Sequence, residues 1–177
     1  MSRFDINETY KILEKISPKM SLTLAAKALG LVSPFNGHLR AKLKEWGHLS
    51  TSFEVKNSRR VRNHLGGFHA GALFTLGESC PGFIIIKNFD FKTYRPILVN
   101  ASIEYFKQVR SKAVGRAETT REKIDVVKTG LETGEPQFLE FETTITNEKN
   151  ELASVCRTKW QIKRWDQVRS SNTDSKN

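Results

Sequence analysis

A glycine-rich stretch that runs directly into an apolar segment of small residues constrains the fold of this chain more than any other feature. It covers residues 63–78 and reads NHLGGFHAGALFTLGE. Glycine lowers helix propensity, so a helix that keeps several glycines needs its backbone to lie close to another surface. We therefore predict a buried helix that starts in this stretch. Pro81 offers no N–H to the carbonyl of Gly77, so we expect a kink there before the helix resumes toward Phe89.

Much of the remaining sequence alternates between apolar and polar residues, which is typical of strands with one buried face. Consecutive strands without helices between them indicate an antiparallel sheet. The sequence therefore predicts an α+β fold in which one long buried helix lies against a sheet of about six strands. The predicted strands are 39–46 and 50–58 before the glycine-rich stretch, and 97–105, 112–126, 139–145 and 152–162 after it.

The N-terminal part of the chain shows helical rather than alternating periodicity. One amphipathic helix is predicted over residues 6–16 and is ended by Pro18, and a second runs from about Ser21 to Gly30. The C-terminal residues are rich in Ser, Asn and Lys and lack apolar periodicity. We predict an N-terminal helical extension over 1–34, one domain over 35–165 and a disordered tail over 166–177.

The composition limits the classes of protein that remain. The chain has 177 residues, enough for one domain of ordinary size. Its longest apolar run, residues 83–86, is far shorter than the roughly 18 residues that a membrane span needs. The two cysteines, Cys80 and Cys156, have no CxxC spacing, and the N-terminus lacks the apolar core of a secretory signal. We therefore expect a cytoplasmic protein that does not associate with membranes.

The charge of the chain points to an anionic partner. There are 29 Lys and Arg against 19 Asp and Glu, a formal net charge of +10. Such a surplus suits nucleic acid, a membrane surface or a small molecule that carries phosphate. The sequence has no helix-turn-helix pattern and no interleaving of aromatic and basic residues, so it does not favour nucleic acid as the partner, although a basic protein associated with nucleic acid stays a rival interpretation.

The start of the predicted helix has the chemistry of a site for acyl transfer. Backbone N–H groups are unpaired at a helix N-terminus and can stabilise a carbonyl oxygen that gains negative charge. Asn63 could add an amide donor, and Glu78 could act as a general base or nucleophile. Each residue also has a structural interpretation, because Asn63 could shape a turn, His69 could be a satisfied polar group and Glu78 could face solvent. The residues alone leave both interpretations open.

The spacing of these residues resembles a known signature. Asn63, His69 and Glu78, six and nine residues apart, are similar to the Asn…His-Gly-Gly…Asp/Glu pattern of hotdog-fold acyl-CoA thioesterases of the phenylacetate-degradation type, nearest to a poorly characterised bacterial branch. The tripeptide reads His69-Ala70-Gly71 here, which keeps the backbone donors. The resemblance implies that Asn63 positions the water or the thioester and that Glu78 is the base or nucleophile. It also implies that the N–H groups of Ala70 and Gly71, which follow His69, polarise the thioester carbonyl.

The resemblance also implies coenzyme A as part of the substrate, with no separate cofactor. Lys107, Arg110 and Lys112 could hold its phosphates, although solvated loops and strand ends would also explain these residues and the basic segments 59–62 and 159–164. The four histidines show no zinc-binding spacing, so no metal is expected. The alternative on the same fold is a protein that binds acyl-CoA without catalysis.

Geometry predicts how many chains such a site needs. Nine residues of helix separate His69 from Glu78, about 13.5 Å along the axis and half a turn out of phase. The two residues therefore point to opposite faces of the helix, and one chain cannot readily bring both to the same carbonyl. We therefore expect a homodimer or homotetramer whose active sites are shared between subunits.

Overall fold

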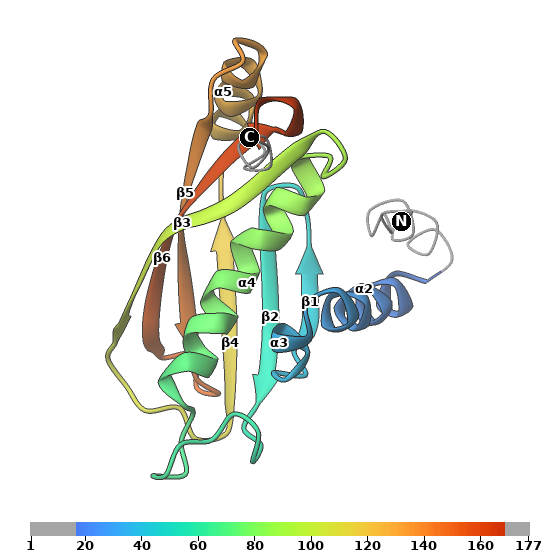
Figure 1. The fold of residues 1–177 in the computed structure, drawn as a ribbon. Helices are drawn as coiled ribbons and strands as arrows, with labels where there is room; N and C mark the ends of the chain where they lie inside the picture. Colours follow the sequence, from blue (N-terminus) through green and yellow to red (C-terminus); the bar gives the residue numbers. More distant parts are fainter. Residues whose placement is uncertain (1–16, 169–177) are drawn as a thin grey trace, which may run out of the picture.

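The computed structural model describes residues 17–168, which form one sheet with helices on and beside it (Figure 1). The predicted helix over 6–16 and the part of the predicted tail from residue 169 onward lie outside the described residues. The helices are α2 (Pro18–Val32), α3 (Pro34–Gly37), α4 (Ala70–Asn88), α5 (Arg121–Glu132) and the 3₁₀ helix η1 (Trp165–Gln167). The strands are β1 (Lys42–Trp46), β2 (Ser50–Lys56), β3 (Tyr94–Tyr105), β4 (Lys112–Glu118), β5 (Gln137–Thr146) and β6 (Leu152–Arg164).

The six strands form a single antiparallel sheet in the order β1-β2-β4-β5-β6-β3. Helix α4 lies along one face of this sheet and contacts β2, β4, β5 and β6 (Figure 1). The predicted α+β architecture, with one long helix against six strands, is confirmed.

The small residues of α4 allow the helix to lie close to the sheet. A Cβ atom added at Gly77 would lie 2.5 Å from the Cβ of Cys156 on β6, closer than side-chain atoms approach one another. Larger residues on the same helix, Leu76, Phe83 and Ile84, are fully buried in the core. The helix runs without interruption from Ala70 to Asn88, through Pro81.

The region after β4 differs from the prediction. The sequence predicted a strand over 112–126, but the strand ends at Glu118 and α5 begins at Arg121. The Thr120 side chain caps this helix by accepting a hydrogen bond from the Lys123 N–H. The prediction was wrong because the buried residues of α5 follow a helical spacing of three and four that the strand interpretation overlooked; they are Ile124, Val127 and Leu131.

The two edges of the sheet are covered differently. At one edge, α2 packs against β1, and Ala25 of α2 is buried in the same core as Leu43 of β1. At the other edge, β3 pairs with β6 on one side only. Long, unpaired edge strands are surfaces on which a second chain can pair.

No helix within residues 17–168 has the length and apolar character needed to cross a membrane.

Candidate active site

The loop before α4 is built around the side chain of Asn63. Its Oδ1 accepts hydrogen bonds from the N–H groups of Leu65 at 3.0 Å and Gly67 at 3.1 Å, and its Nδ2 donates to the Phe68 carbonyl at 3.0 Å. These bonds give Asn63 the turn-forming role that the sequence left open. Its role toward a water or a thioester stays a prediction.

The first turn of α4 presents one unoccupied backbone donor. His69 precedes the helix, and its Nδ1 accepts a hydrogen bond from the Gly71 N–H at 3.0 Å. The Ala70 N–H has no acceptor among residues 17–168, and Ala70 is exposed. Since the N-terminus of a helix carries partial positive charge, this N–H can bind an oxygen that gains negative charge. Of the two predicted donors, the Ala70 N–H is available and the Gly71 N–H is already engaged.

Tyr105, which the sequence analysis did not single out, also lies at this helix start. Its Oη donates a hydrogen bond to the Ala70 carbonyl at 3.0 Å, which joins the end of β3 to the first residue of α4. Partial burial raises the pKa of its phenol, and Cys156 contributes to the shift, so the phenol stays protonated and able to donate. Only its place at the end of an alternating strand was visible in the sequence; the contact depends on the packing of β3 beside α4.

Glu78 lies two turns farther along α4. Burial raises the pKa of its carboxyl above the ordinary value for glutamate, and its side chain forms no ion pair or hydrogen bond within the described part of the chain. Burial and the nearby Glu78 also raise the pKa of the Cys156 thiol to about 11, consistent with a position of Glu78 near β6. A carboxyl with a raised pKa and no partner is suited to accept a proton from water near neutral pH.

The structure does not bring Glu78 and the helix start of one chain together. Glu78 is eight residues beyond Ala70, about 12 Å along the axis of a continuous helix. A reacting carbonyl needs both groups within a few ångströms. One chain therefore does not bring its helix start and its own Glu78 to the same carbonyl, and the site shared between subunits stays a prediction.

The three basic residues predicted to hold phosphates have different surroundings. The Lys107 Nζ lies 3.0 Å from a Glu151 oxygen, and the Lys112 Nζ lies 3.7 Å from a Glu54 oxygen. Arg110 forms no ion pair within residues 17–168, and its Nη1 donates to the Leu65 carbonyl at 3.4 Å. Among the three, Arg110 has the side chain that is least neutralised by its neighbours and nearest to the loop before α4.

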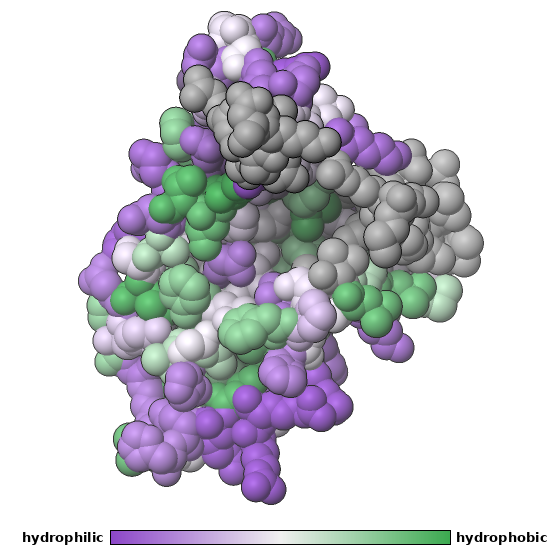
Figure 2. All heavy atoms as spheres, in the orientation of Figure 1, coloured by the Kyte–Doolittle hydropathy of each residue, from purple (hydrophilic) through white to green (hydrophobic). Residues whose placement is uncertain are grey.

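Asn57 joins Arg110 to a second arginine. Its Nδ2 donates to the carbonyls of Arg110 at 2.6 Å and Gly66 at 2.9 Å, and its Oδ1 accepts a hydrogen bond from the Arg62 Nε at 3.4 Å. Hydrophilic residues gather at this end of the molecule, where the loops before α4 and before β4 lie (Figures 1 and 2). Arg62 belongs to the basic segment 59–62 and, like Arg110, has no acidic partner in the described residues. These two residues form the arginine pair.

The residues at this site suit acyl chemistry. Within residues 17–168, no three His, Cys, Asp or Glu side chains are placed to hold a metal ion. The site combines an unoccupied backbone donor at a helix start, a partly buried carboxyl farther along the same helix and an arginine pair nearby. Each of these groups has one capacity that acyl chemistry needs, since the arginines can bind an anion, the backbone donor can polarise a carbonyl and the carboxylate can accept a proton.

Comparison with known protein families decides where this chain belongs. The sequence pattern of the family described as "Domain of unknown function (DUF4442)" matches residues 23–162, which is most of the chain. The chain belongs to this family. A search of curated proteins finds no match.

Solved structures with the same fold include several thioesterases. PA5026 from Pseudomonas aeruginosa, described as a probable thioesterase, is 21% identical and has a TM-score of 0.73 over 80% of this chain and 94% of its own. A putative thioesterase from Shewanella oneidensis is 13% identical, with a TM-score of 0.67 over 79% of this chain and 95% of its own. The thioesterase HI1161 from Haemophilus influenzae is 16% identical, with a TM-score of 0.59 over 80% and 90%. These similarities confirm the hotdog fold.

Proposed function

We propose that this member of the DUF4442 family hydrolyses an acyl thioester of coenzyme A. The observation that carries the proposal is the unoccupied Ala70 N–H at the exposed start of a buried helix, because it is a preformed donor for the oxygen of a thioester carbonyl. The hotdog fold and the thioesterases that share it support the same reaction.

In the proposed reaction, a water molecule attacks the thioester carbonyl carbon while the Glu78 carboxylate accepts its proton. The carbonyl oxygen becomes negatively charged and is stabilised by the Ala70 N–H. Collapse of the intermediate breaks the carbon–sulfur bond, and the thiolate takes up the proton, which leaves a free acid and coenzyme A. Direct attack by the Glu78 carboxylate, followed by hydrolysis of the anhydride, gives the same products.

The site is completed by a second copy of the chain. The edge strand β3 has no partner on its outer side within the described residues, and Val99, Tyr105 and the adjacent Phe106 are 45%, 46% and 54% exposed there. Pairing of two β3 strands would cover these side chains and bring two α4 helices side by side. In this homo-oligomer, the α4 start of one protomer faces Glu78 of its partner.

The arginine pair, Arg62 and Arg110, holds the phosphates of coenzyme A. Arginine binds phosphate through paired N–H donors, and neither guanidinium is neutralised by an acid in the described residues. Lys107 and Lys112, which the sequence placed in this role, are engaged by Glu151 and Glu54. We therefore assign the phosphate contacts to Arg62 and Arg110.

Replacement of Ala70 by proline tests the central observation. Ala70 is the first residue of α4, where proline is tolerated, and His69 already has the extended backbone conformation (φ −68°, ψ 140°) that a following proline requires. Ala70→Pro removes the N–H and keeps the helix start. We expect turnover of an acyl-CoA panel to fall about a hundredfold, the effect typical of losing one oxyanion donor.

The matched control is Ala70→Ser, which keeps the N–H and should retain turnover. If the wild-type protein binds acyl-CoA but turns over no member of the panel, the protein is the non-catalytic alternative. If Ala70→Pro retains full turnover, the Ala70 N–H is not the donor.

A further inference from the structure

A hollow lies at the opposite edge of the sheet from β3, between helices α2 and α3 and the edge strand β1. It is an open groove with a volume of about 1010 Å³, at the upper end of the roughly 300–1,000 Å³ of small-molecule sites. Its lining comes from α2, from α3 and the residues after it, and from β1 and β2. The groove is therefore separate from the loop before α4 and from the arginine pair.

The floor of the groove is apolar and its walls are fixed by close backbone contact. Its partly exposed apolar lining includes Leu22 and Ala26 of α2 and Ala41 before β1, which pack against the buried core residues Leu43 and Phe53. At one end, α2 and α3 touch through glycines, since a Cβ at Gly37 would lie 3.0 Å from the Gly30 carbonyl oxygen. This contact holds the two helices together at that end of the groove. Figure 2 shows apolar side chains gathered over α2.

The rim of the groove carries only positive charge. Lys27, Arg40, Lys42 and Lys44 are exposed lining residues, and no Asp or Glu lines the groove. None of the four forms an ion pair within residues 17–168.

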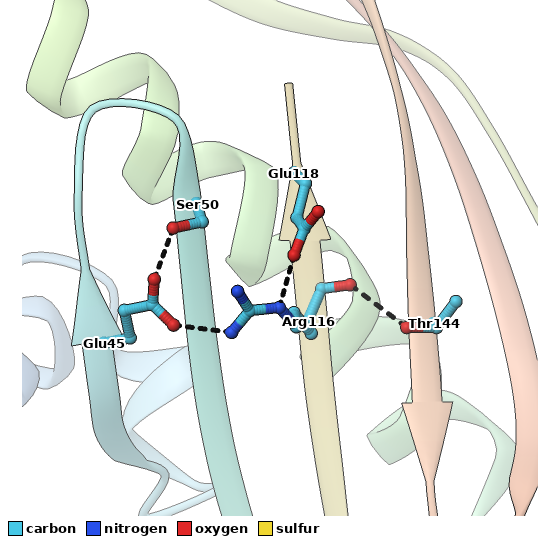
Figure 3. Close-up of polar contacts among 5 residues, drawn as sticks. All are labelled: Glu45, Ser50, Arg116, Glu118 and Thr144. Carbon is cyan, nitrogen blue, oxygen red and sulfur yellow. Dashed lines mark hydrogen bonds and ion pairs between the residues drawn. The ribbon is translucent and has the colours of Figure 1, made fainter. Parts of the chain in front are cut away.

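The acidic residues on the neighbouring strands are already engaged. Glu54 is opposite Lys42 in the β1–β2 register but lies 3.7 Å from the Lys112 Nζ. Glu45 binds Arg116 and the Ser50 hydroxyl (Figure 3). The rim charges therefore remain available to an anionic ligand.

Arg40 has a backbone conformation that is costly for its side chain. Its φ is +48°, in the left-handed region that glycine and asparagine adopt more readily than arginine. The site of this strain is the turn between α3 and β1, at the groove. Strained residues of this kind cluster at ligand sites, because the surrounding structure can maintain a geometry that serves binding.

We propose that this groove binds a long-chain fatty acid, with its hydrocarbon chain on the apolar floor and its carboxylate at the rim formed by Lys27, Arg40, Lys42 and Lys44. An apolar floor without cations would favour a neutral lipid, and a flat basic surface would favour a polyanion; the combination fits an amphipathic ligand with one anionic end. Asn36, which lines the groove, donates a hydrogen bond from Nδ2 to the Ser79 hydroxyl at 3.0 Å and so anchors this site to α4.

Direct binding to the 177-residue chain tests the proposal. We expect palmitate to displace a fluorescent fatty acid with saturation at one palmitate per chain in the groove. Hexadecanol, which has the same chain without the charge, should bind at least about tenfold more weakly, and acetate should not compete. Equal affinity for palmitate and hexadecanol would overturn carboxylate recognition.

Variants locate the binding. Ala26→Trp fills the floor, and the triple change Arg40→Asn, Lys42→Gln, Lys44→Gln removes rim charge while asparagine tolerates the left-handed backbone. Each should weaken palmitate binding at least about tenfold. The charge-matched control is the triple change Arg121→Gln, Lys123→Gln, Lys128→Gln on α5, outside the groove, which should leave affinity unchanged.

Two further measurements distinguish binding in the groove from binding at the thioesterase site and from adsorption to a membrane. Ala70→Pro should bind palmitate as the wild type does, so loss of thioester turnover and loss of groove binding are read independently. Sedimentation with phosphatidylglycerol vesicles that palmitate cannot compete away would assign the surface to a bilayer and overturn the fatty-acid proposal. Unchanged palmitate binding in both the floor and the rim variants would overturn it as well.

Discussion

The hydroxyl of Thr143 on β5 donates a hydrogen bond of 2.8 Å to the carbonyl of Gly77 on α4. This carbonyl lacks its usual helical donor because residue 81, four positions on, is a proline without an N–H. The hydroxyl from the sheet thus replaces the missing backbone bond at a buried position. The contact explains how α4 continues through Pro81 and also ties the helix to the sheet one residue before Glu78.

This relationship predicts a dependence between two mutations. Thr143→Val keeps the side-chain shape but leaves the Gly77 carbonyl unsatisfied, which should lower the free energy of unfolding by about 1–3 kcal/mol. In a Pro81→Ala background the N–H of residue 81 is restored, and the cost of Thr143→Val should fall to less than about 1 kcal/mol. Urea unfolding of the four proteins measures both values. Equal costs in the two backgrounds would show that the hydroxyl does not replace the missing N–H.

The raised pKa of Glu78 predicts opposite pH dependences for stability and turnover. Burial favours the protonated carboxyl, so its stabilising contribution is complete below the ordinary glutamate pKa of about 4.3 and is lost as the pH rises through the higher pKa of the folded state. The wild-type protein should therefore lose stability relative to Glu78→Gln across that range. Unfolding measured at several pH values, with the glutamine variant as reference, checks the sign.

Turnover should rise over the same pH range, since only the carboxylate can accept a proton. Glu78→Gln should fold and bind acyl-CoA but lose more than about nine-tenths of the turnover, which corresponds to at least about 1.4 kcal/mol in the barrier. The kcat/KM profile of the wild type provides the measurement. A glutamine variant with most of the wild-type activity would remove Glu78 from the reaction.

The arginine pair predicts a substrate-dependent effect. Arg62→Gln and Arg110→Gln should each raise KM for acyl-CoA about tenfold, the loss of one charged contact, and should not change KM for a thioester that lacks the nucleotide. Lys107→Gln and Lys112→Gln are matched controls and should have smaller effects, because Glu151 and Glu54 already hold these lysines. Equal effects on both substrates would indicate a structural role for the arginines.

Shared sites predict recovery of activity in mixed dimers. Ala70→Pro and Glu78→Gln homo-oligomers should both have lost most of their turnover. A heterodimer has one site with both changes and one with neither, so it should regain up to about half of the wild-type activity per dimer. Differently tagged chains, co-refolded and purified through both tags, allow the measurement. Inactive heterodimers beside active wild-type controls would rule out the shared site.

The sequence by itself determined the order and type of most elements. Periodicity is a local property, so the alternation of 97–105 was sufficient to predict β3 and the small residues of 70–78 were sufficient to predict the buried α4. The same reasoning failed for Ile124, Val127 and Leu131, where a short amphipathic helix directly follows a strand. The spacing of Asn63, His69 and Glu78 predicted a candidate site on one continuous loop and helix, and the role of each residue in that site stays a prediction.

Only the tertiary structure decided which of these groups are free to act. It paired Lys107 with Glu151 and placed Tyr105 against Ala70. The bond from the Gly71 N–H to the His69 ring, in contrast, joins residues two positions apart and is local. Glu151 is 44 residues from Lys107 and Tyr105 is 35 residues from Ala70, so neither contact has a local signal. Such contacts arise when the strands pair and α4 packs on the sheet, because a hydrogen bond or an ion pair depends on distances that folding, and not sequence spacing, sets.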